Sequence, residues 1–329
     1  MHTDGGNRVA VAFLTHLFDE EIESRYRKLK SDLSRVASVF ILAPLGTSVP
    51  SKYSEEAYLF DYAQLRLEAS CVIGQDLLPG NVHLVALDFF SHHRDFEYYW
   101  FIEYDVVFSG NWATLFAGVL DDPADLLAAH VRSLAEEPRW PWWSTLHFPD
   151  TALPQPLWLR AFFPVYRISR GGLRAVSERV KLGWSGHFEA LIPCAIASAT
   201  LSISDLGGSG TRTPAERRHL FYSSFSSNAG ESLNAGTLRH RPAHIFPLLR
   251  SNTIYHPIKA RSGDGLLNFL RQQHLRELPM RICISLFSLA LRSIHGGRND
   301  ARTLHRQIKE TFCAGLRLKN RRTLSKRQP

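Results

Sequence analysis

Residues 98–108 read Tyr-Tyr-Trp-Phe-Ile-Glu-Tyr-Asp-Val-Val-Phe, and this stretch decides the fold. Its aromatic and β-branched side chains are typical of a strand that is buried on both faces of a sheet. Two carboxylates, Glu103 and Asp105, interrupt the run, and side chains two residues apart on a strand point the same way. A buried charge is costly unless it lies at a strand end or has a partner. Because turn residues follow at 109–111, we expect the pair at the carboxyl end of the strand.

The expected position of Glu103 and Asp105 bears on function. In open α/β sheets, ligands bind beyond the carboxyl ends of the strands. Two carboxylates at that edge suit a divalent cation held against a diphosphate. Acidic side chains at a strand end also serve without any ligand, by capping the next helix or pairing with a surface arginine. Both interpretations stay open at this point.

Strand-like and helix-like segments alternate along the chain on both sides of this stretch. We expect strands at residues 8–14, 36–42, 82–87, 98–108, 125–130 and 162–169. We expect helices at residues 20–35, 58–70, 112–120 and 170–180, and one that begins near residue 189. This alternation predicts an α/β fold in which helices cover both faces of a mostly parallel sheet.

The charge of the chain is uneven. Its 329 residues carry a formal net charge of +8, and much of the excess lies near the C-terminus. A basic chain brings nucleic acid into consideration, but no ladder of aromatic residues alternates with the basic ones as in single-strand binders. Nucleic acid is therefore not favoured as a partner.

The C-terminal region differs in composition from the rest. We expect a catalytic domain at residues 1–261 and a helical, basic appendage at residues 262–329. Residues 280–292 are apolar on nearly all sides but too short to span a bilayer. Burial of this segment is favoured, and contact with an anionic membrane surface is the alternative. The four cysteines of the whole chain have no zinc-site spacing and are typical of a reducing, cytoplasmic compartment, with peripheral membrane contact left open.

The order of these segments resembles that of a GT-A glycosyltransferase, a Rossmann-like sandwich that uses a nucleotide-sugar donor. The resemblance covers roughly residues 7 to 260. Glu103-Tyr104-Asp105 looks like the D-x-D element of that family, with Glu in the first position. The chain looks most similar to microbial transferases of this fold that carry an E-Y-D element.

The resemblance implies roles for individual residues. Thr15 and His16, at the end of the first strand, look like the start of the nucleotide-binding region. Asp105 is the expected metal ligand, and Glu103 helps to position the ribose or the metal. Tyr104 belongs to the same donor-binding element. His256 resembles the late histidine that completes the metal site.

The implied metal agrees with elementary chemistry. A departing nucleoside diphosphate concentrates negative charge, which Mn²⁺ or Mg²⁺ neutralises. Oxygen ligands suit either ion, and an imidazole ligand from His256 favours Mn²⁺. His256 is otherwise an ordinary strand-end histidine before Pro257. Lys259 reaches either a donor phosphate or only solvent.

Glu189 is the candidate catalytic base. It follows Gly186-His187-Phe188 at a turn that enters a helix, where inverting members of the family carry a catalytic acid residue. The alternative is that Glu189 only complements the helix dipole. Taken together, the sequence predicts a metal-dependent glycosyltransferase that moves a sugar to a glycan or lipid-linked acceptor, with inversion favoured. The alternative is a catalytically silent nucleotide- or glycan-binding protein of the same fold.

Overall fold

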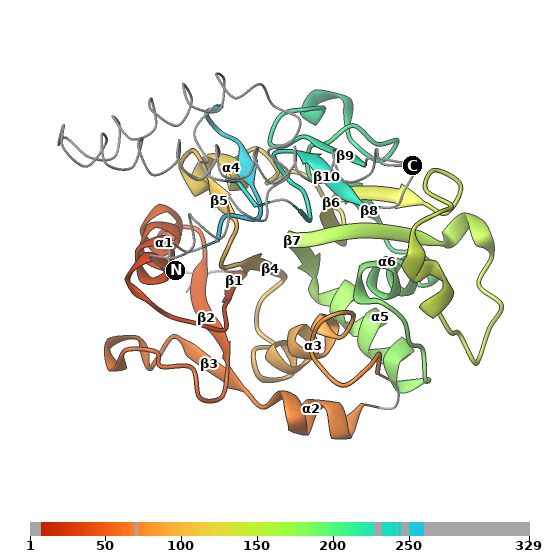
Figure 1. Cartoon of the computed structure of the whole chain (residues 1–329), viewed down its shortest axis with the longest axis horizontal. Helices are drawn as coiled ribbons and strands as arrows, with labels where there is room; N and C mark the ends of the chain where they lie inside the picture. Colours follow the sequence, from red (N-terminus) through yellow and green to blue (C-terminus); the bar gives the residue numbers. More distant parts are fainter. Residues whose placement is uncertain (1–7, 70–71, 227–231, 242, 245–249, 260–329) are drawn as a thin grey trace, which may run out of the picture. The chain divides into compact units, whose positions relative to one another are not determined.

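The computed structural model describes residues 8–69, 72–226, 232–241, 243–244 and 250–259 (Figure 1). A seven-stranded sheet lies at its centre, with strand order β3-β2-β1-β4-β7-β6-β8. Its strands are β1 (Val9–Leu14), β2 (Ser38–Pro44), β3 (Ala57–Phe60), β4 (Tyr98–Glu103), β6 (Leu126–Ser133), β7 (Leu159–Ser169) and β8 (Ile203–Asp205).

The direction of the strands confirms the predicted fold class. Only β7 runs antiparallel to its two neighbours, β4 and β6, while every other neighbouring pair in this sheet is parallel. The sheet of the described region is therefore a mostly parallel, Rossmann-like one. Leu14 of β1 lies opposite both Leu42 of β2 and Glu103 of β4. The carboxyl ends of these strands consequently meet at one edge.

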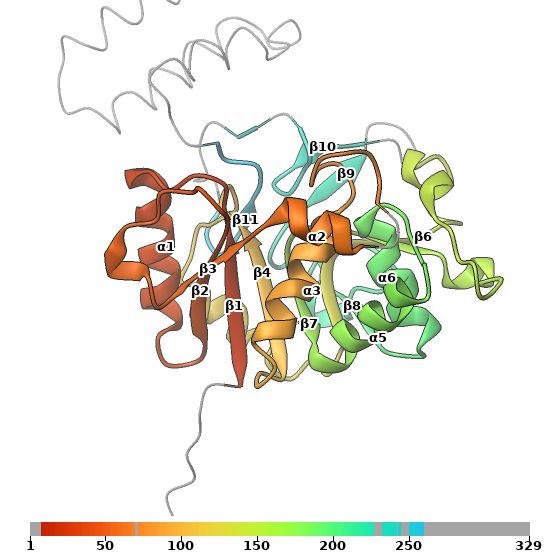
Figure 2. The same ribbon diagram turned by 90° about the horizontal axis from the view of Figure 1, so that it is seen from below.

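Helices cover both faces of the sheet (Figures 1 and 2). The helices are α1 (Glu20–Leu33), α2 (Tyr62–Glu68), α3 (Val82–His92), α4 (Trp112–Ala117), α5 (Arg170–Lys181) and α6 (Phe188–Ser198). Alternation along β1 divides the core, because Val11 and Phe13 pack with α1 and α4 whereas Ala10 and Ala12 pack with α3, α5 and α6. Each face thus has its own apolar layer.

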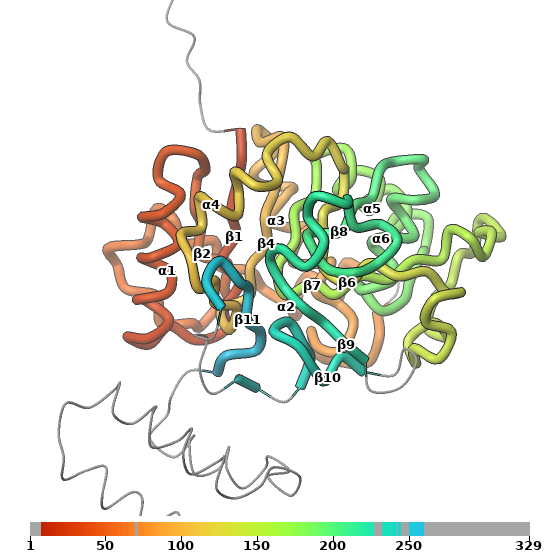
Figure 3. Tube along the Cα trace, turned by 90° about the horizontal axis from the view of Figure 1, so that it is seen from above, coloured from red at the N-terminus to blue at the C-terminus, as the bar shows by residue number. Residues whose placement is uncertain are grey.

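Further short elements complete the described region. In Figure 3, which views the molecule from the side opposite to Figure 2, segments from the later part of the chain pass over the central strands. They include β9 (Ser224–Ser226), β10 (Leu233–Gly236) and β11 (Ile254–Tyr255), and β11 pairs with the two-residue strand β5 (Val107–Phe108). Short 3₁₀ helices lie at Ser51–Tyr53, Pro141–Thr145, Gln155–Leu157 and Ala215–Arg217.

Two of the predicted elements are wrong. The strand expected at residues 82–87 is the first part of helix α3. Its buried residues include Val82, Val85, Ala86 and Phe89, a spacing of three and four that places them on one helical face. The expected strand covered only residues 82–87, which are too few to show this helical spacing. The mainly apolar run continues to Phe90.

The single helix expected at residues 58–70 is instead a strand followed by a helix. The edge strand β3 pairs with β2, a contact that local sequence does not reveal. The helix α2 begins only after Asp61, whose carboxylate accepts hydrogen bonds from the backbone N–H groups of Ala63 and Gln64. This N-cap sets the helix start.

The predicted appendage at residues 262–329, including its apolar stretch, lies outside the described residues. Among the residues that are described, no helix is both long enough and apolar enough to cross a bilayer.

Candidate active site

Three predicted site residues meet at the carboxyl end of β4. One ligand atom from each of Glu103, Asp105 and His256 lies within 4.8 Å of the others. His256 Nε2 is 3.3 Å from a Glu103 carboxylate oxygen and 3.4 Å from Asp105 Oδ1. The structure thus brings together two acids and an imidazole that are distant in sequence. The interpretation of the acidic pair as a mere helix cap does not account for this cluster.

The end of β4 positions the two carboxylates differently from the continuous strand that the sequence predicts. β4 stops at Glu103, and the N–H of Val106 closes a turn by donating to the Glu103 carbonyl at 2.9 Å. Asp105 therefore lies in the turn and not on the strand. β5 follows and pairs with β11, which immediately precedes His256. This small antiparallel pair positions the His256 imidazole beside the carboxylates of Glu103 and Asp105.

Hydrogen bonds fix the orientation of His256. Its Nδ1 lies 2.8 Å from the Arg239 carbonyl, which can only accept, so Nδ1 carries a proton. Nε2 consequently faces the two carboxylates. Arg25 ties the same region together, because its guanidinium donates to the carbonyls of Tyr104 and Ile258 at 2.9 and 2.8 Å. The sequence reasoning missed Arg25, which lies on α1 without any local motif.

Charge is strongly coupled within the cluster. Burial lowers the pKa of His256, but hydrogen bonds and charge from Asp105 and Glu103 outweigh it and raise the pKa to about 9. Burial raises the pKa of Asp105, while His256 and Lys259 more than compensate and hold it below its ordinary value. At neutral pH the cluster thus holds an imidazolium that stabilises the Asp105 carboxylate.

The donor set fits a divalent cation. The buried Asp105 Oδ1 faces His256 Nε2 at 3.4 Å as an ion pair but makes no well-formed hydrogen bond in the described structure. A buried acceptor without a well-formed hydrogen bond is costly unless another group satisfies it. Two carboxylates and one imidazole are a donor set that Mn²⁺ accepts readily, and Mg²⁺ suits the oxygens.

The four residues predicted to bind the donor lie around this cluster. Lys259 forms an ion pair with Asp105, and its Nζ lies 3.4 Å from the Tyr104 hydroxyl. The His16 ring meets the Tyr104 ring edge-on, with centroids 4.8 Å apart. Thr15 is buried, and its hydroxyl donates to the Leu17 carbonyl at 2.5 Å. Its side chain therefore shapes the turn after β1, whereas His16 is exposed and Tyr104 is half-buried against it.

Glu189 lies in the first turn of α6 and is largely buried, with 13% of its side chain exposed. The His187 ring caps this helix by accepting from the Glu189 N–H at 3.4 Å. Burial raises the pKa of Glu189 to about 7, and Arg160 counteracts part of this rise. Glu103 and His256 also shift this pKa, so Glu189 is within electrostatic reach of the acidic cluster.

Sequence reasoning also missed two buried charges beside Glu189. Arg160 on β7 is 3% exposed, and Glu137, which follows β6, is 5% exposed. One signal was available: Arg160 stands in the apolar run Leu-Trp-Leu-Arg-Ala-Phe-Phe at 157–163. A charge inside such a strand requires a partner.

Comparisons with known proteins add a distant likeness. No protein-family model matches the chain, and no curated protein matches it. Among solved structures, the chain is similar to the bifunctional IspDF of Campylobacter jejuni, with a TM-score of 0.36 and 12% identity over 63% of this chain and 52% of that one. The chain therefore spans about half the length of IspDF.

A second similar structure is the galactosyltransferase LgtC, which was solved in complex with donor and acceptor sugar analogues. Its TM-score is 0.36, with 10% identity over 60% of this chain and 72% of that one.

Proposed function

We propose that this protein is a metal-dependent glycosyltransferase that moves a sugar from a nucleoside-diphosphate donor to a glycan or lipid-linked acceptor with inversion. One observation carries the proposal: Glu103, Asp105 and His256 converge at the carboxyl end of a central strand. A sheet edge of this kind is where α/β proteins bind nucleotides. The E-Y-D resemblance and the largely buried Glu189 lead to the same function.

Glu103, Asp105 and His256 are the residues that would hold Mn²⁺ or Mg²⁺. The cation would neutralise the charge that develops on the departing diphosphate. Lys259 adds a positive charge beside Asp105, and its ammonium is suited to a donor phosphate. Tyr104 and His16 present aromatic surfaces next to this point, where a nucleotide would lie.

Glu189 is the proposed base. In an inverting transfer, the acceptor hydroxyl attacks the anomeric carbon while its proton passes to a carboxylate, and the bond to the diphosphate breaks. A pKa of about 7 lets Glu189 accept that proton near neutral pH. Burial removes competing water from the carboxylate, which strengthens its interaction with a bound hydroxyl.

The alternative is a catalytically silent nucleotide- or glycan-binding protein of the same fold. The ion pair between Lys259 and Asp105 favours it, because a protein cation already satisfies one oxygen of the candidate metal ligand. Turnover separates the two functions, since both predict binding of the donor.

The test is a panel of UDP-, GDP-, dTDP- and ADP-sugars with Mn²⁺ or Mg²⁺, read by thermal stabilisation and by donor hydrolysis. The proposal expects one donor to stabilise the protein and to be hydrolysed slowly, with both effects lost in EDTA and in Asp105→Asn. Asp121→Asn, which changes an exposed carboxylate, is the control. Stabilisation without hydrolysis or transfer to any acceptor supports the silent binder, and the absence of any metal-dependent effect contradicts both.

A further inference from the structure

Four ionisable side chains in the interior contact one another in a series that ends at Glu189. His130 Nε2 lies 2.7 Å from Glu137 Oε1, and the other Glu137 oxygen lies 3.2 Å from Arg160 Nη1. Arg160 Nη2 in turn lies 4.0 Å from Glu189 Oε2. These residues come from β6, the segment after it, β7 and α6. Their convergence in the interior is costly and therefore calls for a reason beyond packing.

Arg160 is shared unequally between two carboxylates. Its Nη1 lies 3.2 Å from a Glu137 oxygen, whereas its Nη2 lies 4.0 Å from a Glu189 oxygen. Burial raises the pKa of Glu137, but His130 and Arg160 outweigh it and keep this pKa below its ordinary value. For Glu189 burial prevails, and the pKa rises. His130 and Arg160 together therefore keep Glu137 ionised, whereas Arg160 only partly offsets the effect of burial on Glu189.

Arg160 has little freedom to move toward Glu189. Its guanidinium lies over the Trp140 ring, 4.5 Å from the centroid, and its Nε has no hydrogen-bond partner in the described structure. The residue is 3% exposed. Aromatic stacking and the Glu137 ion pair hold the guanidinium in place, since moving it would disrupt both.

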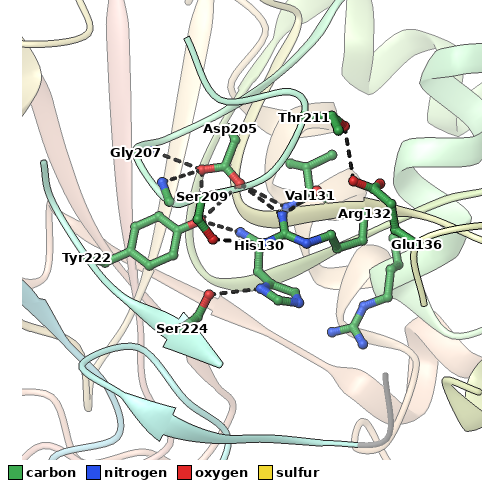
Figure 4. Close-up of polar contacts among 12 residues, drawn as sticks. His130, Val131, Arg132, Glu136, Asp205, Gly207, Ser209, Thr211, Tyr222 and Ser224 are labelled. Carbon is green, nitrogen blue, oxygen red and sulfur yellow. Dashed lines mark hydrogen bonds and ion pairs between the residues drawn. The ribbon is translucent and has the colours of Figure 1, made fainter. Parts of the chain in front are cut away.

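At the far end of this series of contacts, His130 is held in place by a buried network (Figure 4). His130 interrupts β6 with a positive φ of 51°, and its Nδ1 lies 2.8 Å from Ser224 Oγ. Its backbone N–H donates to the Tyr222 hydroxyl, which donates to Asp205. Asp205 is fully buried and also accepts from the N–H groups of Gly207 and Gly208. Figure 4 shows the contacts of His130 with Ser224 and Tyr222, which hold the residue while its Nε2 pairs with Glu137.

We propose that Glu137 and Arg160 are positioning residues for Glu189: Glu137 holds the Arg160 guanidinium to itself and so keeps it from forming a closer ion pair with Glu189. This proposal rests on the proposed function, in which Glu189 is the base. The two residues would set the pH range in which Glu189 accepts a proton. Neither residue touches the reacting atoms in this scheme. Glu137 acts through Arg160, and Arg160 acts through its charge.

Other charged groups also face Glu189 and must be held constant. Glu103 on β4 raises the pKa of Glu189, and His256 after β11 lowers it. Arg160 on β7 lowers it, and Glu137 after β6 raises it. The measurement is therefore made in EDTA, so that no divalent cation changes the charge of the Glu103 and His256 pair.

The test is a ¹³C NMR titration of the full chain labelled at the glutamate carboxyl carbon, with Glu189→Gln identifying the Glu189 signal. Glu137→Gln should lower the pKa of Glu189, because it removes a negative charge and frees Arg160. Arg160→Gln should raise it, because it removes the opposing positive charge. Each shift should be on the order of one pH unit, as for an opposite charge within about 4–6 Å. Arg160→Lys keeps the charge and should shift the pKa far less than Arg160→Gln.

Glu136→Gln is the matched control, because Glu136 is exposed and bonds to Ser133 and Thr211. It should leave the Glu189 titration unchanged. Shifts of opposite sign in Glu137→Gln and Arg160→Gln support the proposal, whereas no shift or equal signs overturn it. If one variant fails to fold, the sign in the other decides. The titration needs no donor or acceptor, so an inactive protein with the expected shifts contradicts the proposed function and not this inference.

Discussion

His256 Nε2 lies 3.4 Å from Asp105 Oδ1, and that oxygen is buried without a hydrogen bond in the described structure. The contact joins the turn after β4 to the residue after β11. His256 Nε2 also lies 3.3 Å from a Glu103 carboxylate oxygen, and neither Asp105 Oδ1 nor His256 Nε2 makes a well-formed hydrogen bond to the other. A divalent cation that displaces the His256 proton would satisfy both, because metal binding is coupled to loss of protons from the ligands.

The first prediction concerns the cation alone. Asp105→Asn should weaken Mn²⁺ binding at least about 100-fold, since losses outside the ligand set already cost about 10- to 100-fold. The amide keeps the shape of the side chain but lacks its charge. Binding is measured by the free Mn²⁺ signal in electron paramagnetic resonance, with circular dichroism as the check on folding. Equal Mn²⁺ affinity in Asp105→Asn and in the Asp121→Asn control would rule out the cluster as the metal site.

The second prediction concerns pH. The pKa of His256 is about 9 in the folded protein, against an ordinary value of 6.5. The imidazolium therefore stabilises the fold fully below pH 6.5, and this stabilisation is lost as pH rises through about 9. In EDTA, the free energy of unfolding should fall across this window. His256→Gln should flatten the slope, whereas His147→Gln, at an exposed histidine, should not. A His256→Gln slope equal to the parent's would contradict the ion pair.

The third prediction concerns the base. Glu189→Gln should lower transfer to an acceptor by roughly 10²- to 10⁴-fold, the usual range for a positioned acid or base. Donor binding should survive, because Glu189 is not among the three clustered ligands. Isothermal calorimetry with the donor and a transfer assay separate the two effects.

Glu189→Gln should also change how the stability of the protein depends on pH. The pKa of Glu189 rises from 4.5 to about 7 on folding, so ionising it costs stability as pH increases from 4.5 to 7. Glu189→Gln should remove that loss and be more stable than the parent above pH 7. A glutamate that merely complements the helix dipole predicts the reverse: slightly lower stability, by a few tenths to about 1 kcal/mol, with unchanged turnover.

The fourth prediction concerns the buried network behind the site. Asp205→Asn should destabilise the fold by about 2 to 3 kcal/mol, because Asp205 accepts charge-assisted hydrogen bonds from backbone N–H groups and from Tyr222. Tyr222→Phe should cost about 1 to 3 kcal/mol by leaving buried partners of its hydroxyl unpaired. Urea denaturation measures both. Losses below those of the exposed control Asp121→Asn would show that the network carries no stability.

Part of this site follows from local sequence. The apolar run that ends in Glu103 predicts a buried central strand, and the turn residues after it predict that both carboxylates lie at the carboxyl end. The structure agrees on both points, although Asp105 lies in the turn. Thr15 also lies at the end of β1, where the register with β4 brings it to the same edge. These features depend on residues adjacent in the chain, whose period and turn chemistry are legible without tertiary contacts.

The mostly parallel α/β fold and the carboxylates at the end of β4 were thus determined by the sequence itself. Tertiary structure decided that β3 precedes α2 and which distant side chains meet. It placed His256 against Asp105 and put Arg160 between Glu137 and Glu189. The physical reason is that pairing across the sheet and burial of charge are properties of segments far apart in the chain. Local propensity sets the elements, and only their packing fixes the electrostatic neighbours that give a carboxylate or an imidazole its chemistry.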